Sequence, residues 1–319
     1  MQGGKSHAAL SGGHPVMAKS IANLPASVHQ LLLNKAKESS RPFNELLQYF
    51  AIERFIYRLS KSPHANQFIL KGALMFSAWC GPASRPTMDI DLLGKIDNQL
   101  DTITAVMKDA CLTDVEPDGM SFNAETVQAV RITEDAEYEG VRVRVRGSLG
   151  KARVSIQIDI GFGDVIVPNA NPVSYPAILD FPAPELKGYT MESTIAEKFQ
   201  AMVKLGVLNS RMKDFYDIWF LSHTFNFKGV ILGEAIEKTF EKRNTPVNLE
   251  AALFDPSFGM DRDKNVQWQG FIKKAKLIGA PDTFEEIVAA VKLFLEPLAA
   301  EIAKRKSFNN IWTAPGPWR

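Results

Sequence analysis

The sequence has no hydrophobic run that approaches the roughly 18 residues needed to span a membrane. Residues 1–17 are rich in glycine, serine and histidine and lack the apolar stretch of a signal peptide. We expect residues 1–22 to be a disordered leader. Cysteine is scarce: Cys80 and Cys111 are the only two, each in an apolar segment and without CxxC spacing. Two reduced thiols are typical of a cytoplasmic protein, so we predict that location and no membrane partner.

The motifs of several common enzyme classes are also absent. The chain contains no Walker A sequence, GxGxxG, GxSxG or HExxH, and its five histidines do not have the spacing of metal ligands. Lysine plus arginine number 37 and aspartate plus glutamate 36, which gives a net charge of +1. A surface for nucleic acid would therefore have to arise from local segregation of charge.

The clearest candidate for a chemical site lies between residues 85 and 93. Asp89 and Asp91 alternate there with apolar residues, so a strand would direct both carboxylates to one face. Such a pair can hold a hard divalent cation, Mg²⁺ or Mn²⁺, through oxygen ligands, although a solvated strand end is the alternative. A glycine turn upstream can bring backbone N–H groups close to a phosphate. The candidate nucleotide-binding residues at the turn and before the acidic pair are Gly72, Ala73, Arg85 and Thr87.

A β-hairpin is predicted over residues 141–160, where valine and isoleucine alternate with polar residues in both halves. A two-residue turn at Ser148-Leu149 would place Arg144 opposite Arg153 and Arg142 opposite Ser155. This register matches the apolar faces and the polar faces together. It also puts Asp159 on the face that carries the arginines.

Asp159 and the hairpin arginines each have a candidate role. Three carboxylates from two strands, beside a turn that contacts phosphate, could form a two-metal site for phosphoryl transfer, so Asp159 is the candidate third ligand. Arg142, Arg144 and Arg146 could form a phosphate track for nucleic acid, and a solvated sheet face is the alternative.

A second constellation of charge lies in the C-terminal part of the chain. Asp214 and Asp217 are three residues apart and share a helix face, with Arg211 one turn earlier. Lys198, on the preceding helix, could point across a cleft toward the aspartates. The alternative is an exposed face of alternating charge, which would add little to stability. The candidate cations for a triphosphate are Lys198, Arg211 and Lys213.

Periodicity divides the chain into two parts. Residues 23–185 mix helical segments with strands, which favours an α/β (α+β) core with a mixed sheet, and residues 186–319 read as a helical lobe. Aromatic residues in the first two helices of this lobe, including Phe215 and Trp219, should pack it against the core. The predicted helices cover residues 24–39, 42–59, 72–80, 98–111, 190–205, 209–219, 229–242, 265–277 and 284–304.

Five segments, in this order and spacing, resemble the AbiEii-type nucleotidyltransferase toxins over about residues 65–225. They are Lys71-Gly72-Ala73-Leu74, Arg85-Pro86-Thr87-Met88-Asp89-Ile90-Asp91-Leu92, Ile158-Asp159-Ile160-Gly161-Phe162-Gly163-Asp164, Ala196-Glu197-Lys198-Phe199 and Arg211-Met212-Lys213-Asp214-Phe215-Tyr216-Asp217. The resemblance implies a polymerase-β-like nucleotidyltransferase core with a helical C-terminal lobe. It also implies a bacterial toxin neutralised by a cognate antitoxin, and some members of the family add nucleotides to the 3′ end of tRNA.

The resemblance also implies roles for single residues. By motif position Asp89 and Asp91 are the catalytic metal aspartates, Lys198 is the lysine that contacts the nucleotide phosphates, and Asp214 is the acidic residue of the second motif. The broader superfamily has Gly-Ser in its turn, whereas Gly72-Ala73 supplies no hydroxyl. We therefore expect transfer of a nucleoside monophosphate from an NTP to RNA. The alternatives are a small-molecule or protein acceptor, or a nucleotide-binding regulator without catalysis.

Overall fold

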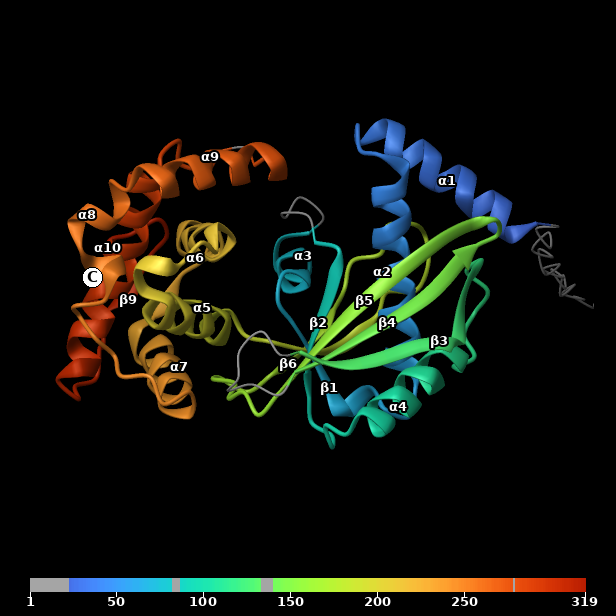
Figure 1. Ribbon diagram of the computed structural model, residues 1–319, viewed down its shortest axis with the longest axis horizontal. Helices are drawn as coiled ribbons and strands as arrows, with labels where there is room; N and C mark the ends of the chain where they lie inside the picture. Colours follow the sequence, from blue (N-terminus) through green and yellow to red (C-terminus); the bar gives the residue numbers. More distant parts are fainter. Residues whose placement is uncertain (1–22, 82–86, 133–139, 278) are drawn as a thin grey trace, which may run out of the picture.

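The structure, a computed structural model, describes residues 23–81, 87–132, 140–277 and 279–319. One lobe is built on a seven-stranded mixed sheet and the other is mainly helical, and the two lie side by side along the long axis (Figure 1). The predicted α/β fold with a mixed sheet and a helical C-terminal lobe is confirmed. The predicted leader and Arg85 lie outside the described residues. No helix in the described part of the chain has the length and apolarity to cross a membrane.

The large sheet has the strand order β3-β4-β5-β2-β1-β7-β6. β2 is parallel to β5 and β1 is parallel to β7, whereas the other neighbouring strands are antiparallel. The strands are β1 (Phe68–Lys71), β2 (Asp89–Gly94), β3 (Met120–Ile132), β4 (Gly140–Leu149), β5 (Ala152–Phe162), β6 (Asn171–Ser174) and β7 (Glu185–Gly188).

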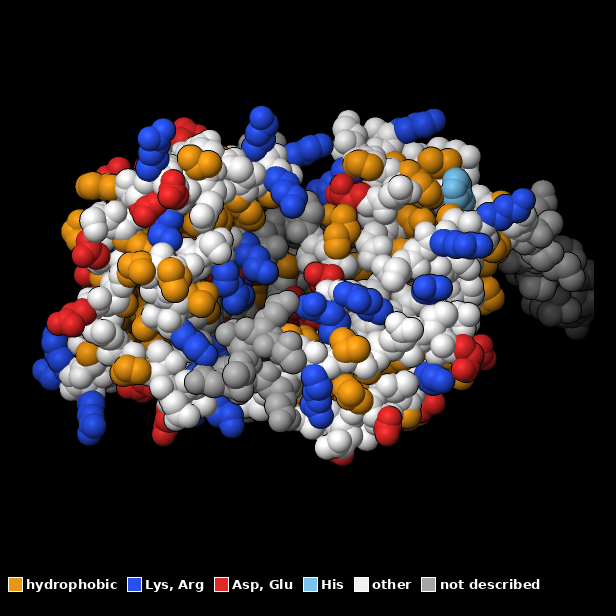
Figure 2. All heavy atoms as spheres, in the orientation of Figure 1, with side chains coloured by type: hydrophobic (Ala, Val, Ile, Leu, Met, Phe, Trp, Pro, Cys, Tyr) orange, Lys and Arg blue, Asp and Glu red, His pale blue; other side chains and the backbone are white. Residues whose placement is uncertain are grey.

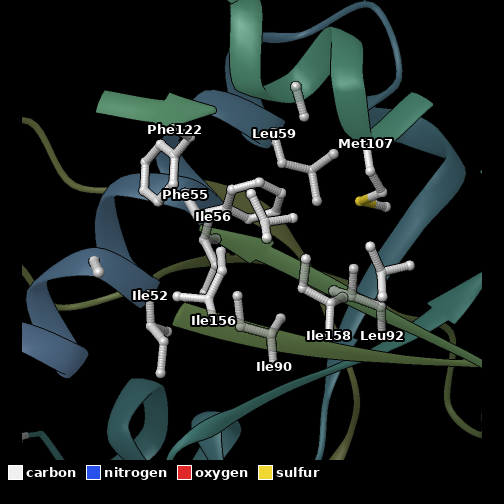
Figure 3. Close-up of a cluster of buried hydrophobic side chains, with 14 of the residues drawn as sticks. Ile52, Phe55, Ile56, Leu59, Ile90, Leu92, Met107, Phe122, Ile156 and Ile158 are labelled. Carbon is white, nitrogen blue, oxygen red and sulfur yellow. The ribbon is translucent and has the colours of Figure 1, made fainter. Parts of the chain in front are cut away.

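Helices cover one face of this sheet. Its apolar side chains, such as Ile90 and Ile158, are fully buried against α2 (Phe43–Lys61) and α4 (Leu100–Leu112) (Figure 3). α1 (Leu24–Glu38) packs on α2, and α3 (Leu74–Cys80) follows β1. Because side chains alternate along a strand, the aspartates and arginines that alternate with these apolar residues lie on the other face.

The hairpin of β4 and β5 is present, but its predicted register is wrong. Leu149 pairs with Ala152, so the turn lies at Gly150-Lys151, where Gly150 takes a φ of +58° that favours glycine. Arg142 is therefore opposite Asp159 and not Ser155, a shift of four residues. An even shift keeps each side chain on its predicted face.

Several other elements differ from prediction. β3 was not predicted because an irregularity between Asn123 and Gln128 interrupts its alternation of buried and exposed side chains. β6 lies in the proline-rich connector, and β8 (Phe227–Lys228) pairs with β9 (Ile311–Trp312) inside the C-terminal part. Three-residue 3₁₀ helices cover Ala65–Gln67, Gly206–Leu208 and Ala252–Phe254.

The C-terminal lobe has its own apolar core, to which Phe199 and Phe215 contribute fully buried rings. Trp219 is only partly buried, so it contributes less than expected to this core. Phe76 of α3 belongs to the same core, which ties the two lobes together. The helices are α5 (Met191–Leu205), α6 (Met212–Thr224), α7 (Gly229–Lys242), α8 (Pro256–Gly259), α9 (Arg262–Ala275) and α10 (Phe284–Ala303).

The predicted boundary at residue 185 falls at the start of β7, which belongs to the large sheet. The helical lobe begins with α5, whose first turn is capped by the Thr190 hydroxyl, an acceptor for the Ser193 N–H at 3.2 Å. A division after residue 189 therefore describes the arrangement of elements better than one after residue 185.

Candidate active site between the two lobes

Three carboxylates lie on neighbouring strands of the open sheet face. Asp89 and Asp91 belong to β2, and Asp91 is the direct neighbour of Asp159 in the parallel pairing with β5. The Asp159 carboxylate accepts two hydrogen bonds from Arg142, from Nε and Nη2, each 2.8 Å long. The sheet thus brings together the three predicted carboxylates, but Asp159 already has a bidentate cationic partner.

The surroundings of the two β2 carboxyls, Asp89 and Asp91, disfavour their ionised form. Burial, together with the charge of Asp159, raises the pKa of Asp89, while Arg142 and Lys213 oppose the rise. Burial likewise raises the pKa of Asp91, against the opposing charges of Lys71 and Lys213. Raised pKa values of adjacent carboxyls identify a place where a cation would be favoured. Lys213, on α6, acts electrostatically on both aspartates.

The turn after β1 lies directly against Asp91. Gly72 has a φ of +68°, and a Cβ atom added to it would lie 2.0 Å from Asp91 Oδ2. Only glycine satisfies both the backbone conformation and this close approach. Ala73 is buried and precedes the first turn of α3. The half-buried Thr87 donates a 3.4 Å hydrogen bond to the backbone oxygen of Asp89, so its hydroxyl is at the start of β2.

The helical lobe contributes a compact ion-pair cluster from α5 and α6. The Lys198 ammonium lies 2.7 Å from Asp214 Oδ1 and 2.8 Å from Asp217 Oδ2, and both carboxylates are fully buried. Arg211 Nε lies 2.7 Å from Asp214 Oδ2. Asp214 thus contacts Lys198 and Arg211 together, and the predicted role of orienting a cation for the nucleotide stays a prediction. The alternative of a solvated charged face is wrong for these buried aspartates.

A cleft of about 290 Å³ is lined by residues of the large sheet and of the helical lobe. Asp91 and Asp159 line one wall, and Arg211 and Lys204 line the other. Lysine and arginine side chains lie on both lobes beside the hollow where they meet (Figure 2). Of the predicted site residues, Asp89, Lys198, Lys213 and Asp214 are not among the described residues that line the cleft. Asp214 contacts the lining residue Arg211.

A second charged network, which sequence reasoning did not identify, joins the lobes at the floor of the cleft. Lys71, at the end of β1, donates to Asp164 Oδ2 at 2.7 Å and to Glu197 Oε1 at 3.1 Å. Arg243, after α7, donates to Asp164 Oδ1 at 2.9 Å and lies 3.3 Å from Glu197. The Tyr189 hydroxyl donates to Glu197 at 2.5 Å.

The electrostatics of this network are mutually reinforcing. Burial alone would raise the pKa of Asp164, but Lys71 and Arg243 hold it below its usual range. Burial alone would lower the pKa of Lys71, but Glu197 and Asp164 raise it. Asp164 and Glu197 lie inside two of the motif segments, which is the signal that could have identified them, whereas Arg243 lies in no motif.

The residues present fit a magnesium site in which the protein supplies some of the ligands and the substrate phosphates supply others. Mg²⁺ is usually held by one or two carboxylates together with waters and substrate phosphates. Asp89 and Asp91 supply hard oxygen ligands on one face, and their raised pKa values favour a cation there. Across residues 23–81, 87–132, 140–277 and 279–319, no three acidic, histidine or cysteine side chains are grouped so as to hold a metal by themselves. Asp159 therefore remains only a predicted ligand.

Comparison with known proteins gives one family and two solved structures. Residues 54–290 match the family described as nucleotidyl transferase AbiEii toxin, type IV toxin–antitoxin system. JHP933 from Helicobacter pylori is 17% identical with a TM-score of 0.44, covering 90% of this chain and 94% of that one. A proposed nucleotidyltransferase from H. pylori is 16% identical with a TM-score of 0.42, covering 89% and 98%. No curated protein matches. Since the family match spans well over half of the chain, the protein belongs to the AbiEii nucleotidyltransferase toxin family of type IV toxin–antitoxin systems.

Proposed function

We propose that the protein transfers a nucleoside monophosphate from an NTP to a hydroxyl of RNA, with the 3′ end of tRNA as the favoured acceptor, and that it requires Mg²⁺ or Mn²⁺. The observation that supports this proposal most is the pair Asp89 and Asp91, which lies on one face of β2 with Lys213 acting on both carboxyls. The family supplies the reaction class and implies an antitoxin as partner.

Asp89 and Asp91 would hold the metal. When bound, the ion would offset the negative charge on the phosphoryl group in transfer. Gly72 permits the backbone of the turn to lie close to Asp91. A phosphate bound beside this turn would meet peptide N–H groups. The absence of a hydroxyl at Ala73 is compatible with such a contact.

The triphosphate would lie against the helical lobe. Arg211 lines the cleft, and its Nε is held 2.7 Å from Asp214, so its guanidinium is the cation that we place against the triphosphate. Lys204 lines the same wall, and Lys213 acts on the aspartates. Lys198 would orient Asp214 and Asp217 and affect the nucleotide through them.

An RNA acceptor is supported by the face of β4 and β5. Arg144 is exposed and stands next to Gln157, with its Nε and Nη2 3.4 Å from the Gln157 amide oxygen. Arg142 is committed to Asp159, so it would position that carboxylate rather than bind a phosphate directly. A strand of RNA that crosses this face would meet positive charge on its way to the cleft.

The proposal is tested by incubating the purified protein with each radiolabelled NTP, Mg²⁺ and total RNA, followed by gel analysis. We expect one or more NTPs to label RNA of tRNA size and to release pyrophosphate. Label on a small molecule or on protein would show that the acceptor is not RNA, while the proposed nucleotidyl transfer would stand. Nucleotide binding without pyrophosphate release would indicate a regulator and contradict catalysis.

A further inference from the structure

A groove of about 570 Å³ lies at the far end of the open sheet face, where no motif of the family falls. β3, β4 and β5 together form it. It is distinct from the cleft between the lobes, since no described residue lines both. Its lining residues are Ser121, Asn123, Thr126, Arg146, Gly147, Ser148, Arg153, Val154 and Ser155.

The lining of the groove is suited to a polyanion. Arg146 and Arg153 are both exposed, and within the part of the chain that the structure describes neither forms an ion pair. Hydroxyl and amide groups make up the other polar side chains, such as the Ser121 and Ser148 hydroxyls, which lie 3.0 Å apart. None of the described residues that line the groove is acidic or aromatic. Phosphate and sugar contacts are therefore favoured over base stacking.

The groove is continuous with the acidic site along the strands. Pairing of β4 with β5 sets Arg146 opposite Ser155, Arg144 opposite Gln157 and Arg142 opposite Asp159, all on one face. Asp159 lies six residues beyond Arg153 along β5. At ~3.3 Å per residue this separation is about 20 Å. An extended single strand, whose phosphates are roughly 6–7 Å apart, would cover it with about three nucleotides.

We propose that this groove binds the sugar–phosphate backbone of the acceptor strand about three nucleotides from the reacting hydroxyl. The inference rests on the proposed function for one point, namely that the 3′ end of the RNA lies at the acidic site. Binding of single-stranded RNA in the groove does not depend on the reaction. Because the contacts go to the backbone, the groove selects the length of a single-stranded end rather than its sequence. Acceptors shorter than about four nucleotides would not reach it.

Direct binding tests the site without any reaction. Fluorescently labelled single-stranded RNAs of two to eight nucleotides are titrated with the intact protein in the absence of NTP, and anisotropy is followed at several salt concentrations. The test variant is Arg146→Gln with Arg153→Gln. The control is Lys304→Gln with Lys306→Gln, which removes two exposed charges near the end of α10 in the other lobe. Thermal unfolding midpoints establish that both variants are folded.

We expect wild type and control to bind the eight-mer at least tenfold more tightly than the test variant does. The slope of log affinity against log salt should fall in the test variant by about 1.4, the value for two lost phosphate contacts on a single strand. Equal affinity of test variant and wild type for the eight-mer would overturn the proposal.

The two proposals can fail separately. If no RNA is ever labelled but the test variant loses affinity for the eight-mer, the groove is an RNA site and the proposed transfer reaction is wrong. If RNA is labelled and the test variant labels two-mers and eight-mers in the wild-type ratio, the transfer reaction stands and the groove proposal is wrong.

Discussion

Gly72 lies so close to Asp91 that a methyl group added at Gly72 would collide with the carboxylate. The Cβ of alanine would approach Asp91 Oδ2 to 2.0 Å, so Gly72→Ala must displace the aspartate or the turn. Gly81 has a similar φ, +76°, but a Cβ there would meet no atom of the described residues within 4 Å. Gly81→Ala therefore carries the backbone strain of about 1 kcal/mol without the collision.

We predict that Gly72→Ala lowers the rate of nucleotidyl transfer at least a hundredfold, because the metal aspartate is misplaced. Gly81→Ala should keep most of the activity. Rates are compared at equal fractions of folded protein, measured by circular dichroism. Equal rates in the two variants would mean that the position of Asp91 does not matter to the reaction.

Glu53 is a buried acid on α2, distant in sequence from every motif. Its carboxylate accepts a 2.7 Å hydrogen bond from the Ile178 N–H, and Arg54, its ion-pair partner, donates to the Pro182 oxygen at 2.8 Å. Burial raises the pKa of Glu53 to about 7 from 4.5, although Arg54 opposes the rise. The pair fixes the connector between β6 and β7 to the helix.

This pKa predicts how stability depends on pH. Between pH 4.5 and about 7 the folded protein keeps the proton that the unfolded chain has lost, so the contribution of Glu53 to stability is lost as pH rises through this window. A shift of this size corresponds to about 3 kcal/mol. We predict that the free energy of unfolding of Glu53→Gln, relative to wild type, increases by that order from pH 4.5 to 7.5. Parallel pH profiles from urea denaturation would contradict the prediction.

At the scale of elements, α5 and α6 are joined by the cluster of Lys198, Asp214 and Asp217. Removing the lysine would take away the cation that lies within 2.8 Å of both fully buried carboxylates and would leave Arg211 beside Asp214. We predict that Lys198→Met lowers the free energy of unfolding by roughly 3–5 kcal/mol and abolishes transfer. Urea denaturation gives the free energy of unfolding, pyrophosphate release gives the rate of transfer, and NTP titration gives the affinity for nucleotide. Unchanged stability together with a loss of NTP binding would contradict this prediction and would indicate that Lys198 contacts the nucleotide directly.

The same elements show how far the sequence could predict the site. Spacing alone placed Asp214 and Asp217 on one face of α6, and alternation placed Asp89, Asp91 and Asp159 on one face of the sheet. Neither pattern could reveal that Asp159 is held by Arg142, because this contact depends on a register set by the φ of Gly150. The burial of Asp214 and Asp217 depends on packing between helices, which periodicity does not specify.

At the scale of the whole molecule, Lys71, Asp164, Glu197 and Arg243 join the two lobes below the cleft. The α/β core and helical lobe were predictable because period two gives way to helical period near residue 190. Arg243 was not predictable, since it reaches Asp164 from a helix end 79 residues away in the chain. Contacts between the lobes depend on how the helices and strands pack against one another, and no local sequence pattern predicts them.

The position of Asp89 allows the most direct test of the account. Asp89→Asn keeps the size of the side chain and removes one negative charge from the proposed metal site. The measurement is pyrophosphate released per enzyme with Mg²⁺, NTP and tRNA, for wild type and for Asp89→Asn of equal thermal stability. We predict a loss of at least a thousandfold, since several kcal/mol of transition-state stabilisation depend on this carboxylate. Wild-type turnover by a folded Asp89→Asn protein would contradict the account.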